Sequence, residues 1–267
     1  MTYCLGLMVE TGLILMTDSR TNAGIDNIST YRKLFDFGVE GERTLIILTS
    51  GNLSASQAIL SLIEEDIKLD EGEHLLNLPT LFAVARYLGH KNRVIAGWDR
   101  PSLEGSNISF SSRMIVGGQI RGEAPSLYLI YTEGNFIRAT PETPFLQLGE
   151  TKYGKTILDR AFRFDSSLED AARCAVISMD AAMRSNLSVG PPLELVMYRQ
   201  DDFCIRQRCR FQEQDPFLRE TRQQWEQALQ ALIPSMPPVP WQEEGLLPPP
   251  PKPTPRRRKA VNTLKKR

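Results

Sequence analysis

Thr2 can act as a nucleophile with the help of fewer other residues than any other side chain considered in this sequence. A chain that begins Met1-Thr2 is of a kind from which the initiator methionine is commonly removed, leaving a threonine with a free α-amine beside its hydroxyl. An α-amine has a reference pKa of about 8 and can take the hydroxyl proton directly or through a water molecule. One residue then serves as nucleophile and general base. We therefore predict Thr2 as a catalytic nucleophile after removal of Met1.

Two charged residues stand at the ends of the strands predicted next. Asp18 closes an apolar run in the tripeptide Asp18-Ser19-Arg20, and Lys33 opens a further run. An ammonium group beside Thr2 would lower the pKa of the α-amine and stabilise an alkoxide, and a carboxylate would hold that ammonium in place. We predict that Asp18 and Lys33 activate Thr2. A turn cap and a solvated lysine are the alternative interpretation.

Thr49-Ser50-Gly51 lies where a predicted strand gives way to a helix. Backbone N–H groups are free at the start of a helix, and they stabilise an oxyanion when they point at it. The sequence therefore predicts that the Gly51 amide contributes to an oxyanion hole.

Other nucleophilic chemistry finds little support. Serine and cysteine hydrolases need a histidine near the nucleophile, and the chain holds only His74 and His90, both in predicted helix or loop. It contains no G-x-S-x-G motif. We expect both histidines to be solvated or locally bonded.

A second motif, at residues 149–156, fits the phosphate-binding pattern G-x-x-x-x-G-K-[ST]. A P-loop needs a mainly parallel sheet, whereas the preceding strands have the pattern of antiparallel ones. Glu150 would also place a carboxylate in a loop meant for phosphates. We therefore expect no nucleotide site here.

The elements that must position these residues follow from the hydrophobic periodicity. Short alternating runs over residues 3–48 predict antiparallel strands, and residues 54–67 and the segment after Pro79 predict two helices. Strands return between 114 and 148, two helices follow to Met183, the second opened by a Ser167-x-x-Asp170 capping box, and strands close at 193–210. This order predicts an α+β fold, a four-layer α-β-β-α sandwich of two antiparallel sheets.

Three segments fall outside this scheme. Residues 98–111 have the composition of an insertion loop or hairpin, and residues 215–233 predict an amphipathic helix. Beyond Pro234 the chain is rich in proline and then basic, which predicts a disordered tail. We thus expect a domain over 1–212, a C-terminal helix over 213–233 and a tail over 234–267.

Charge is distributed unevenly. Residues 252–267 hold eight basic residues and no acid, so residues 1–251 carry 24 basic residues against 32 acidic ones. The acidic body favours neither a membrane nor a specific nucleic-acid partner. No run of about eighteen apolar residues and no signal peptide is found, and four cysteines lack disulfide or metal spacing, so we expect a cytoplasmic protein with no cofactor or metal.

Several segments resemble a known family. The chain is similar to the proteasome-type threonine peptidases of the N-terminal-nucleophile hydrolases, and among them to the bacterial Anbu (ancestral β-subunit) family. The likeness covers residues 2 to about 212 and is carried by MTYCLGLMVETGLILMTDSRTNAG, STYRKL, SGNLSASQ, RMIVGGQ, GETKYGKTILDR and SMDAAMRSNLSVGPPLEL. It implies the same sandwich, with catalytic Thr2, Asp18, Lys33, Gly51 and Ser188 and with Thr21 and Thr49 toward substrate.

Two positions depart from the pattern of that family. Ser185 stands where proteasome β-subunits carry an aspartate that supports the threonine amine, and Glu150 stands where they carry a serine. Both changes leave the nucleophile in place and alter the groups that tune its amine.

Three functions follow as alternatives. The first is a threonine-type endopeptidase subunit acting on peptides or unfolded proteins in a large homo-oligomeric ring or spiral, with an unidentified regulator or ATPase as an open partner. The second is a weakly active or inactive assembly subunit of the same fold. The third is an amidase that acts on a small molecule.

Overall fold

The computed structural model describes residues 2–22, 28–105 and 108–241. Contacts divide the chain into a large unit, Met1–Gln227, and a small one, Ala228–Arg267. Every residue of the site described below belongs to the large unit. The predicted tail lies outside the described residues from 242 onward.

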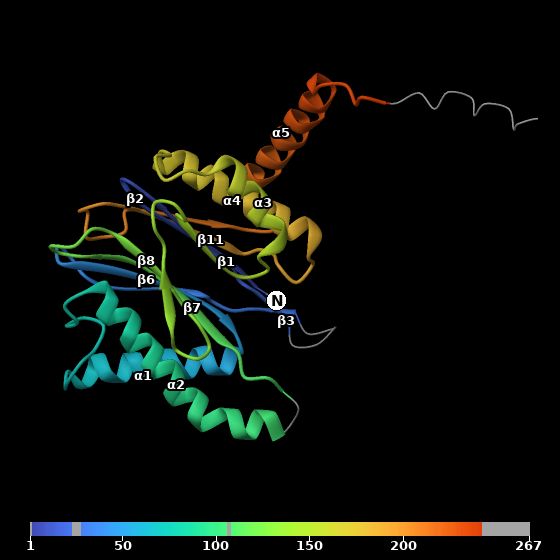
Figure 1. The fold of residues 1–267 in the computed structure, drawn as a ribbon. Coiled ribbons are helices and arrows are strands. Elements are labelled where there is room, and N and C mark those ends of the chain that lie inside the picture. The colour runs from blue at the N-terminus through green and yellow to red at the C-terminus, as the bar shows by residue number, and fades with distance from the viewer. Residues whose placement is uncertain (1, 23–27, 106–107, 242–267) are drawn as a thin grey trace, which may run out of the picture. The chain divides into compact units, whose positions relative to one another are not determined.

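Two five-stranded antiparallel sheets form the centre of the large unit (Figure 1). The first sheet has the order β10-β1-β2-β11-β12 and the second the order β5-β6-β7-β8-β9. The strands of the first sheet are β1 Tyr3–Val9, β2 Gly12–Asp18, β10 Phe145–Gly149, β11 Leu193–Arg199 and β12 Gln207–Phe211. Those of the second are β5 Leu34–Val39, β6 Arg43–Gly51, β7 Ser112–Ile120, β8 Ser126–Ile130 and β9 Phe136–Arg138. A small separate ladder pairs β3 Arg20–Asn22 with β4 Ile28–Thr30.

Helix pairs cover the outer faces of the two sheets, as Figure 1 shows. The pair on the second sheet is α1 Leu53–Leu69 and α2 Leu81–Gly105, and the pair on the first sheet is α3 Lys152–Ala161 and α4 Leu168–Ser185. Three hydrophobic clusters result, one between each sheet and its helices and one between the sheets. The predicted α-β-β-α sandwich is therefore confirmed.

The sheets approach each other closely at β1, which carries the nucleophile candidate at its start. All seven residues of β1 are buried, because the strand lies between two neighbours and is covered on both faces. A Cβ placed on Gly6 would lie 2.8 Å from a methyl carbon of Leu127 in the opposite sheet. The start of β1 is thus fixed by packing from both sides.

One segment differs from the prediction. Residues 98–105, expected in a loop or hairpin, continue α2 to Gly105 despite Pro101. Proline removes one helical N–H and favours a break. Here Leu103 packs against the core and the guanidinium of Arg100 lies 5.7 Å from the centre of the Phe110 ring, so packing outweighs the lost hydrogen bond.

The remaining helix, α5 Pro216–Leu232, starts in the large unit, where Leu218 is buried and Arg222 pairs with Asp180 of α4. The last turns of α5 and the short 3₁₀ helix Ile233–Ser235 belong to the small unit, and Leu229, Leu232 and Ile233 are exposed there. Among the described residues, no helix combines the length and apolar character that crossing a bilayer requires.

Candidate active site

Thr2 lies at the entrance to β1, held through its backbone by the end of β10. The Glu150 N–H donates to the Thr2 carbonyl at 2.8 Å. The preceding residue, Gly149, has a φ of +78°, and a Cβ on it would lie 1.8 Å from the Thr2 oxygen. Only glycine permits this approach, so the turn at Gly149 fixes the position of Thr2.

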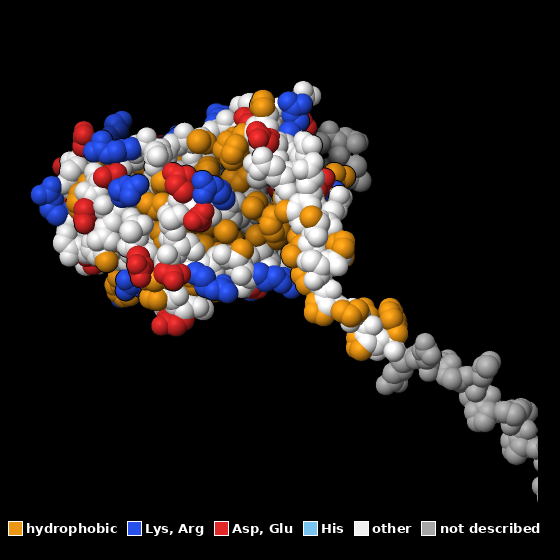
Figure 2. Space-filling view, turned by 90° about the horizontal axis from the view of Figure 1, so that it is seen from above, with side chains coloured by type: hydrophobic (Ala, Val, Ile, Leu, Met, Phe, Trp, Pro, Cys, Tyr) orange, Lys and Arg blue, Asp and Glu red, His pale blue; other side chains and the backbone are white. Residues whose placement is uncertain are grey.

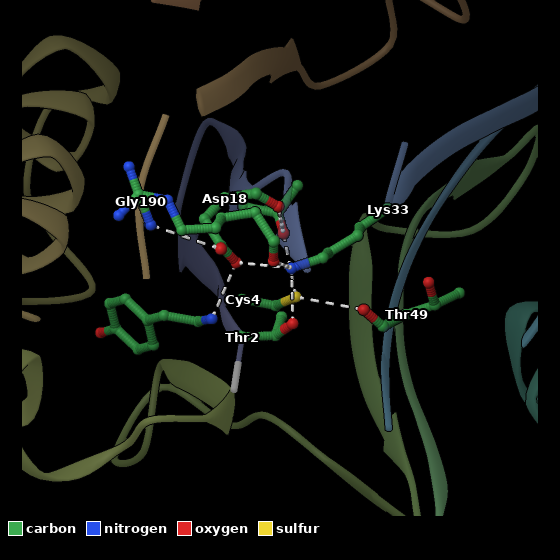
Figure 3. Close-up of polar contacts among 9 residues, drawn as sticks. Thr2, Cys4, Asp18, Lys33, Thr49 and Gly190 are labelled. Carbon is green, nitrogen blue, oxygen red and sulfur yellow. Dashed lines mark hydrogen bonds and ion pairs between the residues drawn. The ribbon is translucent and has the colours of Figure 1, made fainter. Parts of the chain in front are cut away.

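Lys33 reaches this position from the residue before β5. Its Nζ donates to the Thr2 Oγ1 at 2.5 Å, to the Asp18 Oδ1 at 3.1 Å and to the Arg20 carbonyl at 2.6 Å (Figure 3). The three acceptors use the three protons of the ammonium group. The side chain is 6% exposed, so this ion pair is shielded from solvent.

Asp18 ends β2 and is fully buried. Its Oδ1 accepts the Tyr3 N–H at 3.0 Å, and its Oδ2 accepts the Gly190 N–H at 3.5 Å. Burial raises the pKa of Asp18 above its usual value, while the Lys33 ammonium and the Tyr3 N–H act in the opposite direction. The carboxylate thus joins the strand of Thr2, the lysine and the loop after α4.

A cavity of about 230 Å³ opens beside Thr2. Five predicted residues lie on its wall, Thr2, Thr21, Lys33, Thr49 and Gly51, and the other lining residues are Ser50, Leu53, Ser56 and Gly149. Gly51 has a φ of +117°, and a Cβ on it would lie 2.1 Å from the Ser111 carbonyl, so this position also requires glycine. The predicted nucleophile Thr2, Lys33 and the predicted oxyanion residue Gly51 therefore share one pocket.

Ser188, predicted as a catalytic residue, lies in the loop after α4. Ser188 donates its N–H to Asn186 Oδ1 at 3.0 Å, and within the described residues its hydroxyl makes no hydrogen bond to Thr2. Ser185 is the exposed last residue of α4. Asn186 donates instead to Glu150 Oε2 at 2.8 Å. Asn186 thus connects this loop to Glu150, directly after β10.

Sequence reasoning missed Tyr3, Arg20, Gly190 and Asn186. Arg20 and Gly190 contribute backbone groups, which no side-chain pattern reveals. The Tyr3 hydroxyl lies 2.7 Å from Ser178 Oγ and accepts from Gln147 at 2.5 Å, which anchors the residue next to Thr2 below α4. Burial raises the pKa of this phenol to about 12. A tyrosine directly after the nucleophile was the available signal.

The other sequence motifs lie outside this network. His74 contacts Asp70 at 2.8 Å in the connection between α1 and α2, and His90 is exposed on α2. In the P-loop-like segment, Lys155 pairs with Asp159 on the surface of α3, and the adjacent strand is antiparallel to its neighbour. No group of three or more metal-ligating side chains is found in the part of the chain that the structure describes.

Known proteins share this architecture. The family model described as "Proteasome subunit" matches residues 2–197. Anbu (ancestral β-subunit) from Yersinia bercovieri is 40% identical, with a TM-score of 0.84 over 90% of this chain and 99% of that one. The Anbu complex from Pseudomonas aeruginosa, described as a helical assembly, is 46% identical, with a TM-score of 0.84 over 89% and 98%.

A curated relative is more distant. Proteasome subunit beta 2 of Pyrobaculum islandicum is 26% identical over 205 residues, which cover 76% of this chain and 93% of the relative. The match of the family model, the sandwich and the two Anbu structures agree with one another. The chain belongs to the proteasome subunit family and, within it, to the Anbu proteins.

Proposed function

We propose that this chain is a threonine-type endopeptidase subunit that hydrolyses peptide bonds through Thr2 once Met1 has been removed. The observation that carries the proposal is the 2.5 Å hydrogen bond from Lys33 Nζ to Thr2 Oγ1. A buried ammonium that donates to a hydroxyl stabilises the alkoxide form and leaves the hydroxyl proton free to be taken by a base.

In the first step, Thr2 Oγ attacks the carbonyl carbon of the scissile peptide bond, and its proton passes to the Thr2 α-amine. The new C–O bond places the negative charge on the former carbonyl oxygen, toward the Gly51 backbone. When the C–N bond breaks, the α-ammonium returns the proton to the leaving amine. An ester between the acyl group and Thr2 remains.

In the second step, a water molecule attacks the ester carbonyl and gives a proton to the α-amine. The tetrahedral intermediate collapses, Thr2 Oγ leaves and recovers the proton, and a carboxylic acid is released. Lys33 stabilises the Oγ anion in both steps, and Asp18 holds the lysine between Thr2 and the Arg20 carbonyl.

Peptides are the substrate class that the cavity supports. Its wall combines the end of β6, at Thr49 and Gly51, with Leu53 and Ser56 of α1, so an extended peptide can lie across the end of this strand while one side chain enters the pocket. A volume of about 230 Å³ suits a single side chain of moderate size. Thr21 also lines the cavity and would contact the substrate backbone.

Self-association into a large homo-oligomer completes the proposal. The helical assembly described for the Pseudomonas aeruginosa protein supports it. Exposed large side chains support it as well, among them Trp98 at 63% and Leu187 at 85%. Figure 2 shows hydrophobic side chains exposed among charged ones on the face that carries α3 and α4. Such surface favours burial between copies.

The test is labelling of Thr2 with a peptide epoxyketone, which reacts with an N-terminal threonine through its hydroxyl and its amine. Intact mass should show the loss of Met1 and one adduct per chain, located on Thr2. Thr2→Ala should abolish the adduct, and Lys33→Ala should slow its formation about a hundredfold or more. Thr156→Ala, on the exposed surface of α3, is the matched control and should react like wild type.

A chain that retains Met1 would exclude the mechanism, because an amide nitrogen cannot act as the base. A processed chain that forms no adduct would favour the inactive assembly subunit. Turnover of small amides without cleavage of peptides would favour the amidase.

A further inference from the structure

Glu150 joins three parts of the site. It is 6% exposed, and its N–H donates to the Thr2 carbonyl. Its carboxylate accepts two further hydrogen bonds, one at Oε1 from the Lys152 N–H at the start of α3, at 3.1 Å, and one at Oε2 from Asn186 Nδ2, at 2.8 Å. One residue thus contacts the backbone of the nucleophile, a helix start and the loop after α4.

Asn186 extends this connection into the loop. Its Oδ1 accepts the Ser188 N–H at 3.0 Å, and its backbone carbonyl accepts the Val189 N–H at 3.0 Å. The loop then reaches Asp18 through the Gly190 N–H. A side chain that donates on one side and accepts on the other fixes the path of the loop in both directions.

The same loop contacts the residue that holds Lys33. Arg20 donates from its guanidinium to the Leu187 carbonyl at 2.9 Å, and its own carbonyl accepts from Lys33 at 2.6 Å. The loop therefore touches both groups that fix the lysine, the Asp18 carboxylate and the Arg20 backbone.

We infer that Glu150 and Asn186 form a positioning pair, which holds the loop 186–190 and with it Asp18 and Lys33 in register with Thr2. The inference rests on the proposed function of Thr2 and adds two residues to it. Neither residue touches the reacting atoms. Their effect passes through Gly190 and Arg20 to the ion pair that contacts the Thr2 hydroxyl.

The pair can be tested by exchanging the hydrogen-bond donor and acceptor between positions 150 and 186. The carboxylate of Glu150 accepts from both Lys152 N–H and Asn186 Nδ2, whereas an amide at this position has one acceptor and one donor group. In Glu150→Gln the new NH₂ group faces the NH₂ group of Asn186. If Asn186 turns to relieve this, it loses its acceptor for the Ser188 N–H. One of the hydrogen bonds that connect Lys152, Glu150, Asn186 and Ser188 is lost in either arrangement.

Asn186→Asp creates the opposite fault, because it places a second carboxylate against Glu150. The double variant Glu150→Gln/Asn186→Asp restores all three hydrogen bonds, with donor and acceptor exchanged only in the bond between positions 150 and 186. The amide at 150 accepts from Lys152 and donates to the carboxylate at 186, which also accepts from Ser188. Rescue in the double variant is thus expected only if the geometry of the pair matters.

The first readout is the rate of epoxyketone addition to Thr2, measured on folded protein at 25 °C over a range of pH. We expect each single variant to react about ten to a hundred times more slowly and the double variant to approach wild type, because small displacements of reacting groups have effects of this size. The plateau of the pH profile should fall in each single variant and recover in the double variant, which keeps the total charge of the wild-type pair. Glu133→Gln, at an exposed position, is the control.

The second readout is deuterium uptake of peptides that span residues 185–192, which requires no reactivity at Thr2. Uptake should be faster in each single variant and return to the wild-type rate in the double variant. Wild-type uptake in Glu150→Gln, or a double variant as impaired as the single ones, would refute the pair. Rescue of uptake in a protein whose Thr2 never reacts would refute the proposed function and leave the pair intact.

Discussion

Cys4 is the second nucleophile close to the site, two residues after Thr2 on the same strand. Its Sγ lies 3.1 Å from Thr17 Oγ1 and 3.5 Å from the Thr49 carbonyl (Figure 3). Burial raises the pKa of this thiol to about 12, with the nearby Lys33 ammonium acting in the opposite direction. At neutral pH the thiol is therefore protonated and a poor nucleophile. The Cys4 thiol therefore does not compete with the nucleophile that we propose, the Thr2 hydroxyl.

We therefore predict that Cys4 resists alkylation in the folded protein. Iodoacetamide at pH 8 should modify the exposed Cys209 and leave Cys4 unmodified, because the raised pKa keeps the thiolate fraction minute up to a pH near 12 and burial denies access. Peptide mapping by mass spectrometry would measure both sites. Denaturation before alkylation should expose Cys4 and serves as the control. Modification of native Cys4 at the rate of Cys209 would contradict the prediction.

The sequence identified the residues whose side-chain types suggest a reaction by themselves. Thr2, Asp18 and Lys33 were predicted as a group because a nucleophile, a cation and an anion at strand ends have a joint purpose, and the structure brings them into contact. The roles of Glu150 and Asn186 depend on contact across 36 positions of the chain. No local pattern specifies which donors meet a given carboxylate. The catalytic roles of Thr2, Asp18 and Lys33 remain predictions.

At the scale of elements, the turn between β10 and α3 has the most direct effect on the nucleophile. Gly149 approaches the Thr2 carbonyl more closely than a side chain allows, and it adopts a left-handed backbone. Gly72, in the connection between α1 and α2, has nearly the same φ, +76°, with nothing within 4 Å of an added Cβ. A side chain at position 72 would therefore cause backbone strain alone, whereas a side chain at position 149 would cause the same strain and also collide with Thr2.

We predict that Gly149→Ala destabilises the protein by more than the roughly 1–3 kcal/mol of backbone strain alone and displaces Thr2. Gly72→Ala should lower the stability of the protein only by the cost of backbone strain. Thermal melting gives the stability, and the rate of epoxyketone addition gives the effect on Thr2, which should fall in Gly149→Ala and stay unchanged in Gly72→Ala. Equal effects of both substitutions on the two measurements would show that the close approach at Gly149 is unimportant.

The helices and strands that could be predicted were those whose apolar residues repeat at a regular spacing. The strands of residues 3–48 and the helix of residues 54–67 repeat apolar residues clearly, and the structure has them within a few residues of the predicted bounds. The extension of α2 through Pro101 was missed because it depends on the contact of Leu103 with the core. Strand pairing was also out of reach, since β1 pairs with β10, which lies near the middle of the chain and is separated from β1 by α1, α2 and the strands of the second sheet.

At the scale of the whole molecule, we predict a homo-oligomer of many copies. Light scattering coupled to size exclusion should give a mass well above 30 kDa over a broad range of concentrations. Deletion of residues 252–267, a segment outside the described residues, should leave that mass unchanged, because the exposed hydrophobic side chains named above belong to the remaining chain. A species of 30 kDa alone would refute the assembly, and loss of the oligomer on deletion would assign it to the tail.

The wall of the cavity beside Thr2 also includes residues that take no part in the hydrogen bonds to the Thr2 hydroxyl. Thr2, Asp18 and Lys33 belong to strands or their ends, whereas Leu53 and Ser56 belong to the first turns of α1. A substitution at Leu53 changes the space offered to a substrate and touches none of the hydrogen bonds that activate the hydroxyl. Selectivity is thus a separable trait in this fold. Under the proposed function, related chains can therefore differ in the peptides that they cleave while keeping the same activation of the Thr2 hydroxyl.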